Sequence, residues 1–517
     1  MVNFEETPTI PEYFRGKKIF ITGGSGFMGK VLIEKILRSC PDISNIYVLM
    51  RSKKGKSPEE RIKIMTDTPL FNRLKQENPE NIKKITPILG DVTEIGLGLS
   101  PESRKLLIDE VNIVYHAAAS VRFDDPLKDA LLMNTRGTRE VVHLSREIKN
   151  LEILVHVSTT YCQTDKKVIE EKVYPVQADW REAIRAAEHV DPHILNILTP
   201  HYMGAMPNTY TFTKSLSEHV VNDLCDGQIP TVIFRPSIVI STMEDPVAGW
   251  IDNFNGPVGI LVASGKGILR SVYTQPNLTA DYIPVDLVIK GIIISTWAKA
   301  IEKNYEEKLR VSVYNASNNN INNITIKQLV DIGRGLCYDY PLNNTLWYPS
   351  GCVTTCYPNH FLRVIFFHIL PALFIDGLLK LTGQKPMLLK IQRKIYIANM
   401  ALQYFITQEW TFINDKTAKL EDLLSPEDKK LFGYGRKDID PLEYFTNALM
   451  GTRRYLLKED DSTMEQAKVH SKRMYVLYIL FNGLWYLGMF YLIFFQLDLL
   501  GHLGNVIDRA YDYIREL

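Results

Sequence analysis

The sequence predicts an α/β fold: a doubly wound parallel sheet with a smaller substrate-side region, then a helical C-terminal domain and a C-terminal transmembrane helix. Short apolar runs alternate with helix-length stretches up to about residue 240, and this alternation is typical of parallel strands joined by helices. After about residue 355 the chain becomes helical and aromatic. The expected strands are KKIFIT (17–22), NIYVLM (45–50), KITPIL (84–89), NIVYHA (112–117), LEILVHVS (151–158) and TVIFRP (231–236).

Changes in composition suggest boundaries along the chain. Residues 241–350 are richer in Pro, Gly and Asn than the part before them, which is typical of loops. We therefore expect an N-terminal segment (1–15), a sheet domain (16–300), a connecting region (301–354), a helical domain (355–460), a charged linker (461–473), a membrane helix (474–496) and a tail (497–517).

Length, charge and cysteine content exclude several classes of protein. A chain of 517 residues can bury two or more hydrophobic cores. Its 60 basic residues balance 59 acidic ones, so no strong net field attracts nucleic acid. Of the six scattered cysteines, only Cys352 and Cys356 are close in sequence. We therefore expect reduced thiols, no metal site and no nucleic-acid partner.

Residues 474–496, MYVLYILFNGLWYLGMFYLIFFQ, carry no charge. As a helix they would extend roughly 34 Å, enough to cross about 30 Å of hydrocarbon. We interpret them as a transmembrane helix, and a hairpin or in-plane insertion is the alternative. Lys468, His470, Lys472 and Arg473 precede the stretch, which keeps the large N-terminal part cytosolic by the positive-inside rule. We expect a single-pass protein of the endoplasmic reticulum rather than the peroxisome.

Residues 361–381 are a poorer candidate for a membrane span. Five residues interrupt their apolar run: Arg363, His368, Pro371, Asp376 and Lys380. We expect this segment to form the wall of an apolar site or a surface that dips into the membrane.

A glycine-rich turn separates the first expected strand from a helical stretch. Its residues are Thr22, Gly23, Gly24, Ser25, Gly26, Phe27, Met28 and Gly29. Gly23 would permit the tight turn, Gly26 the approach of a pyrophosphate, and Gly29 the packing of helix on strand. The helix N-terminus would then offer N–H groups to the phosphates. A turn that binds no ligand is the alternative.

Three further strand ends favour a bound dinucleotide. Arg51 follows the second strand, where a basic residue suits the 2′-phosphate of NADP. Asp91 and Val92 follow the third strand, in a position to read an adenine edge. Ala117 and Ala118 follow the fourth and leave room for a cofactor. In this order and spacing the features predict NADPH.

A Tyr-x-x-x-Lys pair supplies the candidate chemistry. Tyr210 and Lys214 are four residues apart, on one face of a helix. A phenol has a pKa near 10, and we expect a nearby ammonium and an oxidised nicotinamide to lower it. Thr159, or Ser158, could hold a substrate carbonyl at the fifth strand end, and Asn134 could kink a helix and order a proton-relay water. A tyrosine on a packed helix face is the alternative.

With these residues, the first part of the chain resembles the extended short-chain dehydrogenases/reductases, which have a Rossmann sheet. More narrowly, residues 15–460 resemble the alcohol-forming fatty acyl-CoA reductases, especially the insect members. The stretches that carry this resemblance are HAAASVRFDDPL (116–127), LNILTPHYMGAMPNTYTFTKSLSE (195–218) and FRPSIV (234–239). In a C-terminal domain of the sterile type they are HILPALFIDGLLKLTGQKPMLLKIQRKI (368–395), QEWTF (408–412) and GTRRYLLKED (451–460).

The resemblance implies reduction of a long-chain fatty acyl-CoA to a primary alcohol by two NADPH, through a hemithioacetal and an aldehyde, with release of CoA. Tyr210 would be the acid, Lys214 would tune it, and Thr159 would orient the developing alkoxide. Cys162 has no evident His partner, so we expect no acyl-enzyme. The implied partners are the acyl-CoA and a lipid membrane, and the oligomeric state stays open. One departure is Pro441 within DIDPL (438–442), where relatives usually carry an aromatic residue.

Two rival functions remain open. A membrane-bound hydroxysteroid dehydrogenase would share the first 240 residues and the apolar tail, but it does not account for the motifs in 368–460. A non-catalytic NADPH-binding protein would keep the glycine turn without needing Tyr210 or Lys214.

Overall fold

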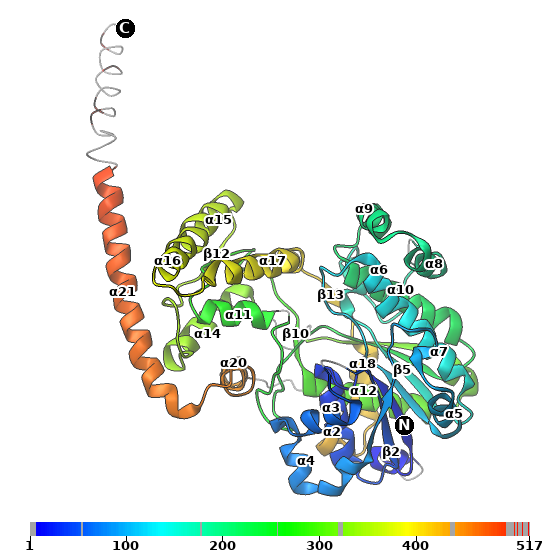
Figure 1. Ribbon diagram of the computed structural model, residues 1–517. Coiled ribbons are helices and arrows are strands. Elements are labelled where there is room, and N and C mark those ends of the chain that lie inside the picture. Colours follow the sequence, from blue (N-terminus) through cyan, green and yellow to red (C-terminus); the bar gives the residue numbers. More distant parts are fainter. Residues whose placement is uncertain are drawn as a thin grey trace.

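The computed structural model describes residues 7–52, 55–175, 178–255, 257–318, 324–434 and 440–492, with residues 501, 504, 509 and 515. Its centre is a seven-stranded sheet of order β11-β7-β5-β4-β1-β2-β3 (Figure 1). Every neighbouring pair runs parallel, so the predicted doubly wound parallel sheet is confirmed. The strands are β1 (Lys18–Thr22), β2 (Asn45–Met50), β3 (Ile85–Leu89), β4 (Ile113–His116), β5 (Ile153–Val157), β7 (Thr231–Pro236) and β11 (Val311–Ala316).

The strand β11 is an addition to the six strands that the sequence predicts. It pairs with β7 at one edge of the sheet, although its residues belong to the stretch interpreted as a connecting region. Ser312 and Asn315 interrupt its apolar run, which removes the usual signal of a buried strand. Asn315 is nevertheless fully buried, because its side-chain amide donates to the carbonyl oxygens of Ile169 and Ile413 at 3.1 and 2.8 Å.

Helices cover both faces of the sheet. Successive side chains of a strand point to opposite faces, so each face carries apolar side chains that a layer of helices buries. Ile19 and Ile21 pack under α2 and α12, whereas Phe20 faces the cluster formed with α5, α7 and α10. The helices of the two layers are α2 (Phe27–Ser39), α12 (Val285–Ala300), α5 (Pro101–Glu110), α7 (Gly137–Glu147) and α10 (Thr209–Cys225). Smaller helices flank them: α1 (Ile10–Phe14), α3 (Pro58–Thr66), α4 (Asn72–Glu77), α6 (Leu127–Ala130), α8 (Trp180–His189), α9 (Pro192–Met203) and α13 (Tyr305–Leu309).

A helical region lies beside the sheet domain (Figure 1), as predicted for the C-terminal part. Its helices are α11 (Pro257–Gly265), α14 (Ile326–Asp339), α15 (Tyr357–Val364), α16 (Leu370–Leu381), α17 (Leu388–Ile406) and α20 (Pro441–Gly451). Short parallel pairs tie the segments together: β8 (Ile238–Ile240) with β10 (Tyr282–Pro284), and β9 (Ser271–Tyr273) with β12 (Cys352–Thr354). Pro441 stands at the start of α20, a position that tolerates proline; Asp438 and Ile439 lie outside the described residues.

The C-terminal sequence also returns to the sheet domain. The strand β13 (Thr411–Phe412) pairs with β6 (Val168–Ile169). The helices α18 (Asp415–Leu420) and α19 (Pro426–Phe432) follow it. Leu420, Leu424 and Phe432 belong to the same buried cluster as the residues of α2 and α12. The two parts of the chain therefore share one hydrophobic core.

Among the described residues, two helices are long and apolar enough to cross a membrane, judged by length and composition. One comprises Tyr357–Leu381, where a π-helical turn (Ile365–Ile369) joins α15 to α16. The other contains α21 (Met464–Tyr491), which begins inside the stretch predicted as a charged linker. Residues 493–496 of the predicted membrane helix lie outside the described part of the chain.

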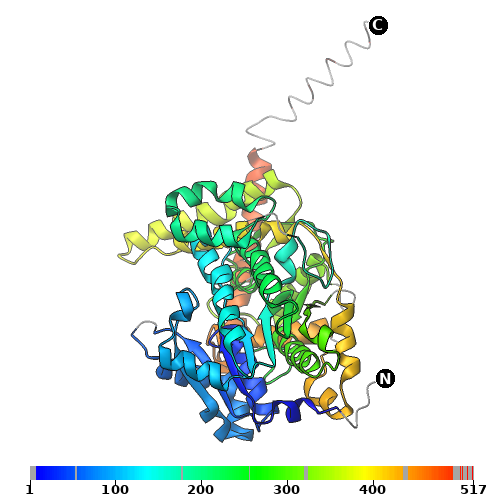
Figure 2. The same ribbon diagram turned by 90° about the vertical axis from the view of Figure 1, so that its right-hand side faces the viewer.

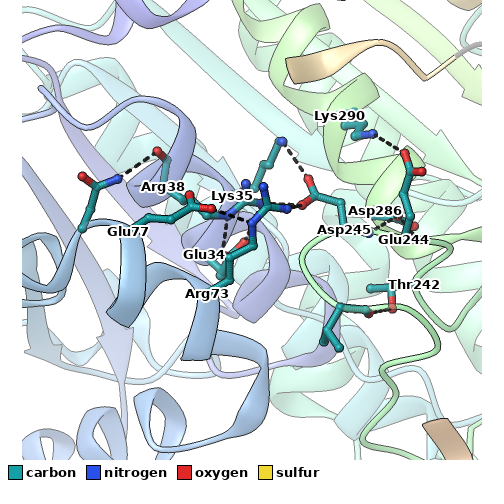
Figure 3. Close-up of polar contacts among 12 residues, drawn as sticks. Glu34, Lys35, Arg38, Arg73, Glu77, Thr242, Glu244, Asp245, Asp286 and Lys290 are labelled. Atoms are coloured by element: carbon teal, nitrogen blue, oxygen red, sulfur yellow. Dashed lines mark hydrogen bonds and ion pairs between the residues drawn. The ribbon is translucent and has the colours of Figure 1, made fainter. Parts of the chain in front are cut away.

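Charged side chains are buried between α2 and the loop that follows β8 (Figure 3). The Asp245 carboxylate lies 2.7 Å from the Lys35 ammonium and 2.6 Å from the Arg38 guanidinium. Although burial raises the pKa of Asp245, the two cations outweigh it and lower the pKa below its usual value. Asp286 accepts the backbone N–H groups of residues 243–245 at 2.8, 3.0 and 3.1 Å. The network fixes this loop against the helix that starts at the glycine turn.

Candidate active site

The glycine turn between β1 and α2 leaves no space for side chains. Gly23 has a φ of +77°, and a Cβ there would lie 2.6 Å from the backbone of Ala117 and Ala118 at the end of β4. A Cβ on Gly29 would lie 2.3 Å from the Gly23 oxygen. The backbone of the turn is therefore packed directly on the neighbouring strand end and on the first turn of α2.

The N-terminus of α2 fits a pyrophosphate. Gly26 occupies the N-cap position and provides no side-chain cap for this helix of 13 residues, so the first N–H groups and the positive end of the helix dipole are available to an anion. Thr22 does not face this space: its hydroxyl is buried and lies 2.7 Å from Nδ1 of His116. Phe27 instead stacks on Trp250 at 5.4 Å, which links the turn to the loop after β8.

A basic pair lies next to the glycine turn. Arg51 is about half exposed and contacts the Asp91 carboxylate at 3.1 Å. Arg61, on α3, donates to the Arg51 carbonyl at 2.6 Å and to the Ser25 hydroxyl at 3.1 Å. Burial and the neighbouring Arg51 lower the pKa of Arg61. Sequence reasoning missed Arg61, because it lies in the second turn of an ordinary capped helix and outside any motif.

Asp91 is oriented by its neighbours. Besides Arg51, its carboxylate accepts the hydroxyl and the backbone N–H of Thr93 at 2.9 and 3.0 Å. Although burial raises the pKa of Asp91, these hydrogen bonds and Arg51 lower it overall. The next residue, Val92, is buried and leaves no room for a side chain on Gly137, whose Cβ would lie 2.3 Å from it.

Tyr210 and Thr159 come together over the end of β5. Tyr210 is in the first turn of α10, which Asn208 caps by accepting the Thr211 N–H at 2.9 Å. Burial raises the pKa of Tyr210 to about 12, and a hydrogen bond with the Thr159 side chain opposes the rise. Ser158 is buried, and its hydroxyl has no hydrogen-bond partner among the described residues. Thr159 is therefore the hydroxyl that lies next to the phenol.

Lys214 lies one helical turn after Tyr210 and is also buried. Its ammonium donates to the Val157 carbonyl at 2.6 Å. Burial lowers the pKa of Lys214 to about 8, although Glu218 opposes the shift. The sequence predicts that Lys214 lowers the pKa of Tyr210, whereas in this structure burial dominates and the phenol has a raised pKa.

The Asn134 side chain connects two segments of the protein through hydrogen bonds. It lies in a π-helical turn between α6 and α7. Its side chain accepts the Ser120 N–H at 2.8 Å and donates to the Ser120 carbonyl and the Thr213 hydroxyl at 3.1 and 2.9 Å. Asn134 thus ties the loop after β4 to the helix that carries Tyr210.

Cys162 is close to the candidate site, but its thiol is not activated. Burial raises the pKa of Cys162 well above its usual value. The thiol donates to Glu218 at 3.3 Å, and Glu218 pairs with the buried Arg235 at 2.6 Å. These contacts are structural and do not prepare a thiolate nucleophile.

An apolar cavity of about 260 Å³ opens next to this site. Its lining is contributed mainly by β8 to β10, α11, α14, α17 and α20, and includes Tyr161, Phe405 and Trp410. Phe405 contacts Phe123 at 5.2 Å, and Phe123 stacks on Tyr210 at 5.8 Å. A continuous series of aromatic rings therefore leads from the candidate acid to the cavity. Sequence reasoning could not locate the cavity, because its walls come from residues distributed between 161 and 452.

Comparison with known proteins identifies two matching family models, both described as male sterility protein. An NAD-binding model matches residues 21–292, and a Sterile model matches residues 367–459. Fatty acyl-CoA reductase 1 of Rattus norvegicus is 38% identical over 470 residues, which cover 90% of each chain. Fatty acyl-CoA reductase wat of Drosophila melanogaster is 38% identical over 474 residues, 92% of this chain and 90% of that protein.

Solved structures are similar in fold. The terminal R domain from the myxalamid PKS-NRPS biosynthetic pathway has a TM-score of 0.57 at 17% identity, covering 89% of this chain and 96% of that one. The reductase domain of a non-ribosomal peptide synthetase from Mycobacterium tuberculosis has a TM-score of 0.55 at 18% identity, covering 86% and 93%.

Proposed function

This chain belongs to the fatty acyl-CoA reductase family, and we propose that it reduces long-chain fatty acyl-CoA to the primary alcohol with two NADPH. Membership of the family makes it a nicotinamide-dependent oxidoreductase of fatty acyl groups. The observation that carries this proposal is the series of rings from Tyr210 through Phe123 to Phe405. It joins a proton donor to an apolar cavity that suits an alkyl chain.

The preference for NADPH over NADH is supported by Arg51 and Arg61. The Arg61 guanidinium donates to Ser25 within the glycine turn and to the Arg51 carbonyl, and the Arg51 guanidinium pairs with Asp91. A 2′-phosphate is a dianion that arginine binds through charge-assisted hydrogen bonds. On binding, the Arg51 guanidinium would contact the 2′-phosphate instead of the Asp91 carboxylate, or together with it.

The proposed mechanism uses Tyr210 as the acid in both reductions. The glycine turn and the N-terminus of α2 would hold each NADPH in turn, and each would supply the hydride for one reduction. Tyr210 donates its phenolic proton to the oxygen that develops negative charge, and Thr159 orients that oxygen. With a pKa of about 12, Tyr210 is protonated at all physiological pH values, as an acid in the reducing direction must be.

Lys214 would assist as a cation one helical turn from the phenol. With a pKa of about 8 it is mostly protonated at pH 7, so its charge favours the phenolate that forms when Tyr210 gives up its proton. When the C–S bond of the hemithioacetal breaks, its hydroxyl proton would return to the Tyr210 phenolate and CoA would leave as the thiolate, so that the aldehyde meets a protonated Tyr210 in the second reduction. Asn134 positions the helix of Tyr210 and has no proposed contact with the substrate.

We also propose that the protein is tail-anchored, with its catalytic part in the cytosol. The uncharged half of α21 and the basic residues that precede it, Lys468, Lys472 and Arg473, support this topology. The endoplasmic reticulum is the proposed membrane in preference to the peroxisome.

The proposal is tested with membranes that contain the protein. They are supplied with C16 or C18 acyl-CoA and with NADPH or NADH, and the products are resolved by gas chromatography. We expect fatty alcohol with NADPH, and a loss of 10²- to 10⁴-fold in rate, roughly the contribution of a general acid, in Tyr210→Phe. Tyr202→Phe, on the adjacent α9, is the matched control and should retain activity.

Three results would change the assignment. Aldehyde that accumulates without alcohol would limit the protein to the first reduction. No product from any acyl-CoA would favour a steroid substrate or a non-catalytic role, and full activity in Tyr210→Phe would remove Tyr210 as the acid.

A further inference from the structure

The helix Tyr357–Leu381 exposes apolar side chains around most of its circumference. Leu373, Phe374 and Ile375 are 48%, 68% and 41% exposed. Successive helical residues project about 100° apart, so these three alone cover roughly 200°. A helix on the surface of a water-soluble protein would alternate apolar and polar faces, and this one therefore needs an apolar surrounding on more than one side.

The same helix packs beside the middle of the candidate membrane helix. The rings of Phe366 and Phe367 lie 6.5 and 6.3 Å from that of Trp485 on α21. Trp485 stands at the centre of the uncharged stretch 474–496. If α21 crosses the hydrocarbon, the residues at its centre are deep in the layer, and the helix Tyr357–Leu381 is at lipid level with them.

Basic side chains lie at the end of α16, in the turn that follows it and in the first half of α17. Lys380, Lys385, Lys390, Arg393 and Lys394 are exposed, and no described carboxylate forms an ion pair with any of the five.

The nearby acid, Asp376, is already engaged. Its carboxylate accepts the N–H groups of Met387, Leu388 and Leu389, each at 2.9 Å, and so caps α17. The basic residues are thus complementary to anionic lipid phosphates, and their long side chains can extend from an apolar layer to its surface.

A second apolar surface lies on the same side of the molecule. Ile194, Ile197 and Leu198 of α9 are 52%, 63% and 46% exposed, and their spacing places them on one helical face. Both views show α9 near the level of α15 and α16 (Figures 1 and 2). The sheet domain therefore also has an exposed apolar helical surface at this level of the molecule.

We propose that α15, α16 and α17 form a hairpin that embeds in one lipid leaflet beside α21, with its basic residues at the phosphate level and α9 in contact with the same surface. This inference rests on the proposed membrane span of α21 but not on the proposed reaction. The helix α17 separates lipid from the cavity: Tyr396 and Ile397 are exposed, whereas Leu402 and Phe405 line the cavity. An acyl chain dissolved in the leaflet is thus one helix away from its binding site.

The test places a fluorescent NBD probe on single cysteines of the full-length protein in lipid nanodiscs. The background is Cys356→Ser, which removes the one described cysteine classed as exposed, and its residual labelling is subtracted. Phe374→Cys reports on the hairpin and Leu484→Cys on α21. Tyr305→Cys, at a position 73% exposed on α13, is the matched control. Quenching by nitroxide lipids is compared with quenching by aqueous iodide, and alcohol formation is assayed in the same discs.

We expect lipid nitroxide to quench the probes at residues 374 and 484 at least threefold more than the probe at residue 305, and iodide to quench in the opposite order. Iodide quenching at 374 with lipid quenching at 484 would overturn the hairpin and leave the span of α21 intact. The absence of lipid quenching at both positions would overturn both. Loss of alcohol formation with the expected quenching pattern would count against the proposed reaction alone.

Discussion

The two parts of the candidate site are built on different principles. The cofactor side is built on closely packed backbone, and an added methyl group at Gly23 or Gly29 would overlap main-chain atoms. The acyl side is a cavity with mainly aliphatic and aromatic walls that come from many distant segments. Backbone atoms cannot move aside cheaply, whereas side chains can adopt other rotamers. An atom added to the packed backbone of the glycine turn should therefore abolish cofactor binding. A change in the cavity wall should instead alter substrate binding gradually.

The largest expected effect comes from Gly23→Ala. The new Cβ would meet the Ala117 and Ala118 backbone at 2.6 Å, at a residue with φ of +77°. We expect a loss of at least about 100-fold in NADPH affinity, measured by cofactor fluorescence, because both strain and clash act on the phosphate cradle. Gly227→Ala is the matched control: its φ is +71°, but its Cβ would meet nothing within 4 Å. If both variants bind NADPH equally well, the tight turn is not part of the cofactor site.

The pH dependence of reduction should follow Lys214. Its pKa is lowered to about 8, so the ammonium is present below pH 8 and is lost as the pH rises, while Tyr210 stays protonated up to about 12. We expect kcat/KM to be level near pH 7 and to fall above pH 8, by about tenfold per unit if the cation is essential.

Lys214→Arg sharpens this assignment, because a guanidinium does not lose its proton in this range. The fall of kcat/KM at high pH should begin above pH 9 in this variant, even if its activity is lower. A fall that still begins near pH 8 in Lys214→Arg would assign the titration to another group.

A smaller effect is expected from Arg61→Gln. Losing one charge-assisted contact to a 2′-phosphate costs about 1.5 to 3 kcal/mol, so KM for NADPH should rise at least about tenfold while KM for NADH stays unchanged. Arg104→Gln is the control, because Arg104 on α5 pairs with Glu147 of α7 at 2.6 Å and is not part of the glycine turn. An equal rise of both KM values would mean that Arg61 only supports the fold of the glycine turn.

The smallest effects are expected in the cavity. Leu336 on α14 is buried and lines it, whereas Tyr338 on the same helix is 67% exposed. Leu336→Trp should shorten the preferred acyl chain, since each methylene that no longer fits loses about 0.8 kcal/mol, or roughly fourfold in kcat/KM. Tyr338→Trp should leave the chain-length profile unchanged. A uniform loss over all chain lengths in Leu336→Trp would indicate that the cavity does not hold the acyl chain.

The two sides also differ in how far sequence could predict them. Residues 17–22 and the turn that follows form a local pattern, and the positions of Arg51, Asp91 and Tyr210 follow from strand ends and helix spacing. Arg61 reaches the same place from a separate helix, so local spacing contains no sign of it. The strand β11 was missed because Ser312 and Asn315 break its apolar run. The Asn315 side-chain N–H groups donate to carbonyl oxygens about 100 or more residues away, and no local pattern reveals these partners.

The cavity lay beyond prediction for a different reason. Trp410 and Phe412 belong to the QEWTF motif, but their position in the wall depends on the pairing of β13 with β6. Arg453, in GTRRYLLKED, is fully buried and pairs with Glu459 at 3.2 Å. These motifs contribute to the shape of the fold, and only three-dimensional contacts show what they enclose.

The return of residues 411–432 to the sheet domain also determines when the hydrophobic core is completed during synthesis. Domains generally fold from the N-terminus as the chain emerges, yet the face of α12 gains Leu420, Leu424 and Phe432 only after more than four-fifths of the chain has been made. Until these residues are made, the nascent sheet domain exposes part of the apolar surface of α12. Because α21 follows soon after these residues, completion of this core and the proposed insertion of α21 into a membrane should fall close together in time.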